Sequence, residues 1–368
     1  MSEVSIPLLR PPYPSRSPMV FGRVTDPGMC ERHQRVYGRT HAVLPPAEAL
    51  RLRNATVFGN GFIRDASGGL LRFSLRRPNH QPDVPNEVAK TITGHTVALL
   101  RKPGDSNYGH WLVEILPRVL ELRATFPDAD LKFGVPSGPI NMRTTRNYTL
   151  GFLGVTPDQI IPLAGHATLV EDLVLVTSNS IHNHTHHHEG VNAVAELGRR
   201  AAATGRGPKR LFVRRVSRKR LLLNENELAA IAEDWGFTVI SPEKLSAKQQ
   251  IEAFADAQII VGATGAAMTN AMWAAPGCHV ACLTPNTGSD HFFFDLSTIR
   301  GQRHATIFGQ SVGEGVHADF HVKPTDFLRW LRCVTNPIWR LSHLAMRPFS
   351  DDFRVERPSR FFARTFMP

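Results

Sequence analysis

The sequence has only 4 cysteines in 368 residues, and their spacing matches neither a zinc site nor a redox motif. No run of apolar residues approaches the eighteen that a membrane-spanning helix needs, and the first residues lack the basic start and apolar run of a signal peptide. Low-complexity tracts are missing as well. These absences predict a cytoplasmic protein with reduced thiols, whose contact with a membrane, if it has one, is peripheral.

Acidic residues are in the minority, with 32 Asp and Glu against 43 Lys and Arg, which gives a formal net charge of +11. Such an excess indicates a polyanionic partner: nucleic acid, an anionic membrane surface or a phosphate-bearing substrate. The chain has neither zinc-finger spacing nor a ribonucleoprotein-type aromatic motif, so we do not expect nucleic acid. The basic residues gather between Lys209 and Arg220 and again between Arg340 and Arg364.

Turn residues and apolar runs divide the chain into four parts. Residues 1–50 are rich in proline and arginine, with turn residues at Asp26, Pro27 and Gly28, and are predicted to be an irregular lead-in. Strand-like and helix-like segments alternate after His95 and again after a linker at 204–208, which predicts βαβ units and mostly parallel sheets. We therefore expect an α/β protein with an N-terminal lobe at 51–203, a C-terminal lobe at 208–334 and a basic, aromatic tail at 335–368.

The tail allows two interpretations. It is predicted to cross back onto the first lobe and to touch an anionic inner-membrane surface, because its aromatic residues alternate with arginines. A solvated, partly ordered extension is the alternative.

A glycine-containing turn follows an apolar strand in the second lobe, in the run AQIIVGATGAAMTNAMWAAPG. The strand ends before Thr264 and Gly265, and small residues then begin a helix whose first backbone amides suit a diphosphate. Close packing is the alternative reason for glycine at such a turn. A dinucleotide fingerprint needs a third glycine and an acid about twenty residues later, which this run lacks, so an oxidoreductase is disfavoured.

A histidine and a glutamate are four residues apart in NYGHWLVEILPRV, residues 107–119. If a helix begins near Tyr108, His110 and Glu114 share one face, which suits a general base. In one arrangement His110 removes the proton of an acceptor hydroxyl and Glu114 orients the imidazole. In the other, Glu114 removes the proton and His110 donates a hydrogen bond to a phosphate of the donor. A surface ion pair is the structural alternative.

The basic run VRRVSRKR, residues 213–220, follows the first strand of the second lobe. A guanidinium group can donate two parallel hydrogen bonds to phosphate oxygens, and its charge stabilises a departing diphosphate. A solvated charge run is the alternative. The histidine-rich stretch nearby matches no metal motif, and we expect it to line a cleft without holding a metal; its histidines are His182, His184, His186, His187 and His188.

Taken in this order, NYGHWLVEILPRV, VRRVSRKR and the segment from Glu243 to the glycine turn resemble glycosyltransferase family 61, over about residues 95–330. The resemblance implies a GT-B architecture of two Rossmann-like lobes, inversion at the anomeric carbon and no cofactor or metal. His110 and Glu114 fall on the catalytic positions. The donor-binding positions are Arg214, Arg215, Arg220, Glu243, Thr264, Gly265, Ala266, Thr269 and Asn270, with Gln250 on the helix before the turn.

One position departs from the family pattern. Members often have histidine just before the second glycine, where this sequence has Thr264. Threonine cannot carry a positive charge, so stabilisation of the leaving group is expected to fall on the arginines.

The expected function is therefore transfer of a sugar from a nucleotide sugar, such as UDP-xylose or UDP-GlcNAc, to a glycan or lipid-linked acceptor in capsule or exopolysaccharide synthesis. The location expected for it is the cytoplasm, with contact at the inner face of the membrane. A non-catalytic sugar-nucleotide or glycan-binding protein on the same scaffold is the alternative, and Thr264 is the feature that favours it.

Overall fold

The computed structural model describes residues 4–24, 26–44, 46–74, 82–177, 180–181, 185–216, 219–288, 290–313 and 318–336. Three predicted features fall outside this part of the chain. They are His182 and His184 of the histidine-rich stretch, Arg218 of the basic run, and the tail from residue 337 onward.

The first lobe is built on a seven-stranded mixed sheet with the order β1-β5-β10-β7-β8-β9, and β6 pairs with β5. Neighbouring strands from β10 to β9 pair in parallel, whereas β5 runs antiparallel to both β1 and β10. The strands are β1 (Val4–Leu8), β5 (Ala47–Phe58), β6 (Phe62–Arg64), β7 (Lys90–Leu99), β8 (Leu131–Pro136), β9 (Ile160–Leu163) and β10 (Thr168–Val176). The accompanying helices are α2 (Tyr108–His110), α3 (Arg118–Thr125), α4 (Ile140–Phe152) and α5 (His188–Ala202), with short 3-10 helices η1 (Arg72–Ser74) and η3 (Pro157–Gln159).

The second lobe is built on another seven-stranded sheet, with the order β14-β13-β15-β16-β17-β18, and β3 (Met19–Phe21) of the N-terminal segment pairs with β17. All of these neighbours are parallel except β17 and β18. The strands are β13 (Arg210–Val213), β14 (Thr238–Ile240), β15 (Ile259–Ala263), β16 (His279–Pro285), β17 (Arg303–Val312) and β18 (Asp319–His321). The helices are α6 (Glu225–Asp234), α7 (Ala247–Ala255), α8 (Phe292–Ile299), α9 (Pro324–Thr335) and two 3-10 helices, η4 (Pro242–Lys244) and η5 (Ala266–Trp273).

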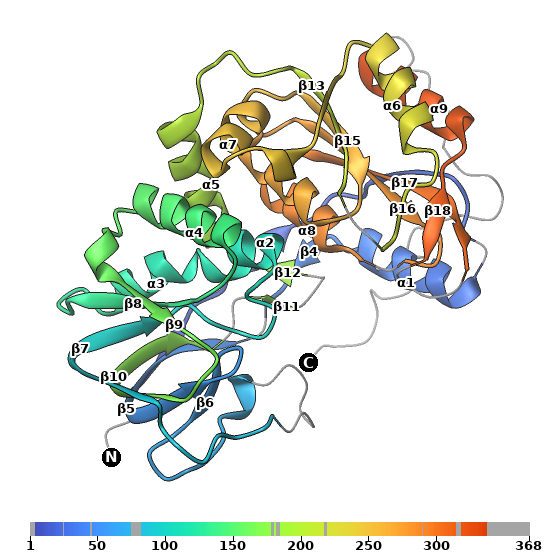
Figure 1. The fold of residues 1–368 in the computed structure, drawn as a ribbon. Coiled ribbons are helices and arrows are strands. Elements are labelled where there is room, and N and C mark those ends of the chain that lie inside the picture. The colour runs from blue at the N-terminus through green and yellow to red at the C-terminus, as the bar shows by residue number, and fades with distance from the viewer. Residues whose placement is uncertain are drawn as a thin grey trace, which may run out of the picture.

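Two α/β lobes, each with its own sheet, confirm the predicted fold class (Figure 1). After the N-terminal segment, the chain passes from the first lobe to the second between the end of α5 and the start of β13. One hydrophobic core extends across both lobes, because it includes Trp111 and Val194 of the first and Trp273 and Phe292 of the second. The boundaries proposed from sequence, 51–203 and 208–334, stay a prediction.

The segment expected to be irregular, residues 1–50, contains regular elements that attach to both lobes. Strand β1 joins the first sheet, whereas β3 (Met19–Phe21) pairs in parallel with β17 of the second sheet. Helix α1 (Pro27–Tyr37) lies beside the second lobe (Figure 1), and Tyr37 Oη is 2.9 Å from Thr306 Oγ1. Strands β2 (Tyr13–Pro14) and β4 (His41–Ala42) pair with each other.

Asp26 and Pro27, read as turn residues, begin helix α1 instead. The Asp26 side chain accepts a hydrogen bond from Met29 N at 2.6 Å, and Pro27 occupies the first helical position. Both residue types favour the start of a helix as well as a turn, because the first amides of a helix need an outside acceptor and proline needs none. The sequence pattern alone does not separate the two.

Helix α5 packs closely on the second lobe at Gly198. A Cβ atom at this position would lie 2.5 Å from the ring of Trp273, which is fully buried. We expect Gly198→Ala to destabilise the protein by about 1–3 kcal/mol, because the ring has no space into which to move. Thermal unfolding should show a lower midpoint.

Gly151→Ala in α4 is the matched control, because nothing lies within 4 Å of a Cβ atom there. Alanine at an open helical position is neutral or slightly stabilising, by roughly 0.5–1 kcal/mol. Equal midpoints for the two variants would contradict the close packing of α5 on Trp273.

Candidate active site

The segment that carries His110 and Glu114 begins as a helix, as the sequence predicts, and changes pitch after one turn. Asn107 caps α2 by accepting a hydrogen bond from Gly109 N at 2.8 Å. A π-helical turn, η2 (Trp111–Ile115), follows, in which Leu116 N donates to Trp111 O at 2.8 Å. Such turns are rare and frequently occur at functional sites.

His110 and Glu114 form the expected pair, with His110 Nδ1 2.8 Å from Glu114 Oε1. Lys102, in the loop after β7, contacts the other carboxylate oxygen. Burial by itself would raise the pKa of Glu114, but the hydrogen bond from His110 and the charge of Lys102 lower it well below its usual range. Glu114 is therefore an ionised acceptor, and Nδ1 of His110 must be the donor.

The two members of this pair differ in their access to solvent. The Glu114 side chain is 0% exposed, whereas that of His110 is 16% exposed. A general base must come within hydrogen-bond reach of the proton that it removes. Only His110 meets this requirement, so the geometry favours His110 as the base and Glu114 as its support.

Arg215 and Gly265 come together at the carboxyl edge of the second sheet. A Cβ atom at Gly265 would lie 2.5 Å from Arg215 Nε, so the guanidinium lies directly on the glycine backbone. Only glycine leaves this space, and its extended backbone conformation is one that any residue can adopt. Ligands of open α/β sheets bind outside the carboxyl ends of the strands, which is where this contact lies.

Arg220 and Glu243 lie around Arg215. Arg215 Nη1 donates to Arg220 O at 3.3 Å, and Glu243 Oε1 accepts from Val216 N at 3.3 Å. Burial and the charge of Arg220 lower the pKa of Arg215, yet a guanidinium stays protonated. Arg220 has a positive φ of 58°, which a non-glycine residue adopts only at a cost, and such residues cluster at functional sites.

Arg214 does not join this group. Its side chain points toward α6, where Nη1 donates to Asn226 Oδ1 at 2.9 Å on the exposed surface. Neighbouring residues on a strand point to opposite faces, so only one of the two arginines after β13 can face Gly265.

The polar side chains around the glycine turn make their hydrogen bonds mainly to other residues of the protein. The Thr264 hydroxyl donates to Leu283 O at 2.8 Å, and the buried Asn270 side chain bonds to Tyr108, Gln250 and Trp273. The run after Gly265 is a 3-10 helix, η5, whose residues from 267 to 273 are buried. Ala266 is half-buried at its start. Thr264 and Asn270 therefore have clear structural roles.

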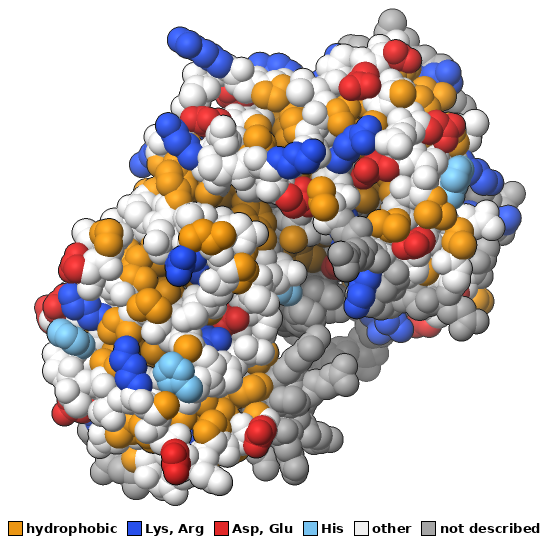
Figure 2. Space-filling view, viewed as in Figure 1, with side chains coloured by type: hydrophobic (Ala, Val, Ile, Leu, Met, Phe, Trp, Pro, Cys, Tyr) orange, Lys and Arg blue, Asp and Glu red, His pale blue; other side chains and the backbone are white. Residues whose placement is uncertain are grey.

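The turn that carries His110 packs directly on η5. Tyr108 Oη donates to Asn270 Oδ1 at 2.6 Å, and a Cβ atom at Gly109 would lie 2.7 Å from Thr269 Oγ1. That hydroxyl is buried and makes no hydrogen bond to any described residue. The first lobe thus brings His110 next to the turn that follows Gly265, and Figure 2 shows the surface recessed where the lobes meet.

Sequence reasoning missed Lys102 and Asp295, both of which contribute to this region. Lys102 contacts Glu114, and Asp295 of α8 binds the backbone and ring of His186. Neither lies in a recognisable motif, although His186 belongs to the histidine-rich stretch. Within the described ranges, no group of three or more potential ligands is placed to hold a metal.

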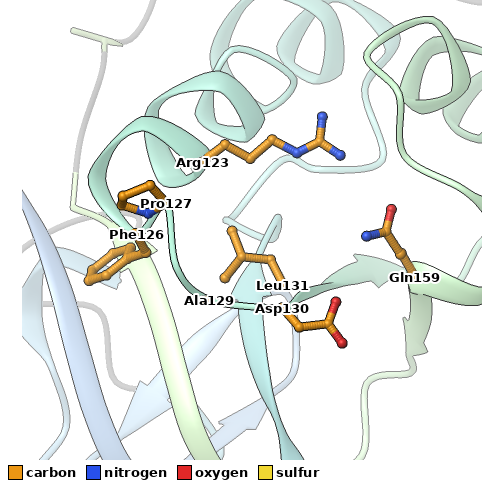
Figure 3. Close-up of a pocket in the computed structure, with 7 residues that line it drawn as sticks. All are labelled: Arg123, Phe126, Pro127, Ala129, Asp130, Leu131 and Gln159. Atoms are coloured by element: carbon orange, nitrogen blue, oxygen red, sulfur yellow. The ribbon is translucent and has the colours of Figure 1, made fainter.

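A pocket of about 320 Å³ lies on the first lobe, away from these residues (Figure 3). Its lining includes Arg123, Phe126, Asp130 and Gln159, but none of the predicted site residues. Arg123 donates to the carbonyl oxygens of Leu153 and Gly154, so its guanidinium is committed to the fold. We assign no role to this pocket.

The two α/β lobes bring a histidine and carboxylate pair of the first lobe next to an arginine-lined glycine turn of the second. Residues 108–281 match the protein-family model Glycosyltransferase 61. This stretch is a glycosyltransferase family 61 domain, so the protein is a glycosyltransferase that moves a sugar from a donor to an acceptor. None of the curated proteins compared with the chain matches it. Among the described residues, none of the helices has the length and the apolar character of a membrane-spanning segment.

Proposed function

We propose that the protein is an inverting glycosyltransferase that uses a nucleoside-diphosphate sugar and transfers its sugar to a hydroxyl of a glycan or lipid-linked acceptor. A UDP-sugar, such as UDP-xylose or UDP-GlcNAc, is the donor that we favour. Synthesis of a capsular or extracellular polysaccharide at the inner face of the membrane is the context we propose, in which the tail beyond residue 336 would provide the membrane contact.

The observation that carries this proposal is that the histidine and carboxylate pair lies next to the arginine-lined glycine turn. The pair His110 and Glu114 belongs to a turn that contacts η5 through Gly109 and Tyr108, and η5 begins at the Gly265 turn beneath Arg215. A base from one lobe and cations from the other suit a direct displacement between an acceptor hydroxyl and a diphosphate ester.

In the proposed reaction, the acceptor hydroxyl gives its proton to His110 Nε2 while its oxygen bonds to the anomeric carbon. The bond from that carbon to the diphosphate oxygen breaks on the opposite face, and the electron pair leaves with the diphosphate. Glu114 stabilises the imidazolium that forms, as a carboxylate behind a catalytic histidine does. In this proposal, Arg215 and Arg220 stabilise the charge on the diphosphate. Glu243, which accepts a hydrogen bond from Val216 N, binds the ribose hydroxyls.

Release of nucleoside diphosphate from a panel of nucleotide sugars, with and without glycan acceptors, tests this function. We expect one donor to give acceptor-dependent release and a product whose anomeric configuration, read by NMR, is opposite to that of the donor. Retention of configuration would contradict the single displacement. Binding of a donor with no release on any acceptor would support the non-catalytic alternative.

A further inference from the structure

His186 is a buried histidine that joins the two lobes behind the proposed base. It ends the short strand β12 (Thr185–His186), and its ring is fully enclosed. Its Nδ1 is 2.8 Å from Asp295 Oδ2, and its backbone N donates to the same oxygen at 2.9 Å. Because an ionised carboxylate only accepts hydrogen bonds, Nδ1 carries the proton in this contact.

Asp295 is held in place by residues from the N-terminal segment. Its other oxygen accepts hydrogen bonds from Tyr13 Oη and Arg39 Nη2, each at 2.6 Å. The carboxylate is fully buried, and burial together with the Asp295 charge raises the pKa of Tyr13, which keeps this phenol protonated as a donor. Four hydrogen bonds from two other parts of the chain therefore fix Asp295, and with it the plane of the His186 ring.

The opposite edge of the ring faces Glu114. His186 Nε2 lies 3.8 Å from Glu114 Oε1, the same oxygen that His110 Nδ1 approaches to 2.8 Å. Nε2 is buried and makes no hydrogen bond to any residue that the structure describes. The Phe292 ring packs on His186 at 4.6 Å between centroids, so the imidazole has no room to turn aside.

We propose that His186 is a positioning residue, which is fixed through Nδ1 by Asp295 of the second lobe and uses Nε2 to keep the Glu114 carboxylate turned toward His110. The attraction requires a second proton, on Nε2, so that the ring is an imidazolium between the Asp295 and Glu114 carboxylates; a lone pair in that place would repel the carboxylate oxygen. His186 thereby links the orientation of the base to the contact between the lobes. The effect of His186 on sugar transfer rests on the proposed function, whereas its contact with Glu114 is independent of that function.

Two substitutions separate the two edges of the ring. His186→Asn places an amide near the position of Nδ1, so it keeps the contact with Asp295 and loses the one with Glu114. His186→Gln places an amide near Nε2 and restores a donor toward Glu114. We expect kcat to fall about tenfold in His186→Asn at an unchanged donor KM, with partial recovery in His186→Gln, because positioning supplies only part of what a general base contributes.

A double-mutant cycle tests whether the effect passes through His110. If His186 acts only on the base, His186→Asn should not lower the residual activity of His110→Ala any further. Additive losses in the double variant would overturn the proposal, and so would a normal kcat in His186→Asn.

A measurement without substrate keeps this inference separate from the proposed function. In protein with ¹⁵N-labelled histidine, the Nδ1 proton of His110 reports its hydrogen bond to Glu114. We expect its resonance to shift or broaden in His186→Asn and to be restored in His186→Gln. An unchanged His110 resonance in His186→Asn would overturn the positioning role even if the wild-type enzyme transfers sugar. A shifted resonance in an enzyme that transfers none would contradict the function alone.

Discussion

Replacing His110 by alanine is expected to lower kcat by about 10²–10⁴-fold, because a positioned general base contributes that much to a proton transfer. The donor KM should change little, since the imidazole acts on the acceptor hydroxyl. Glu114→Gln should also lower kcat strongly, because a neutral amide supports the imidazolium less well than the buried carboxylate does. Initial rates of nucleoside-diphosphate release measure both.

His95→Ala is the matched control for this experiment. His95 lies exposed on β7, outside the turn that carries the pair, and its loss should leave kcat unchanged. Thermal unfolding of each variant would show that the fold is retained. Near-normal turnover by a folded His110→Ala enzyme would remove His110 as the base, and Glu114 is too enclosed to take its place.

Replacing Arg215 by alanine is expected to lower kcat by roughly 10²–10³-fold, the loss that follows removal of one well-placed group that stabilises transition-state charge. Arg215→Lys should recover only part of the activity, because an ammonium group cannot offer the paired donors of a guanidinium. Gly265→Ala should resemble Arg215→Ala, since its Cβ atom would displace the guanidinium from the turn.

Arg214→Ala is the control that the structure provides. The two arginines are adjacent in sequence, yet Arg214 bonds to Asn226 on the surface and Arg215 lies on Gly265. We expect Arg214→Ala to retain nearly all of its activity. Equal losses at the two positions would indicate that the basic run acts through its summed charge and not through one placed guanidinium.

The alternation of strands and helices after His95 was sufficient to predict the two α/β lobes, because hydrophobic periodicity is a local property of the chain. The four-residue spacing of His110 and Glu114 was likewise sufficient to predict their contact. The strands of the N-terminal segment could not be predicted in the same way. Strands β1 and β3 are short pieces that exist because distant strands β5 and β17 offer them an edge.

The site residues that matched the family pattern differ in the contacts that they make in the structure. Thr264 donates to a strand carbonyl and Asn270 links Tyr108 to Trp273, so the hydrogen bonds of both side chains are made inside the protein. Motif position identifies the neighbourhood of a residue. Hydrogen-bond partners, which come from elements far apart in sequence, decide what the side chain does there.

From sequence alone came the class of the protein, the order of its lobes and the short segments in which its chemistry must lie, since these depend on residues close together along the chain. Tertiary structure decided which arginine faces the glycine turn, which member of the histidine and carboxylate pair reaches solvent, and that Asp295 and His186 stand behind that pair. Burial and charge pairing arise only when distant segments pack, and no spacing within one segment contains that information.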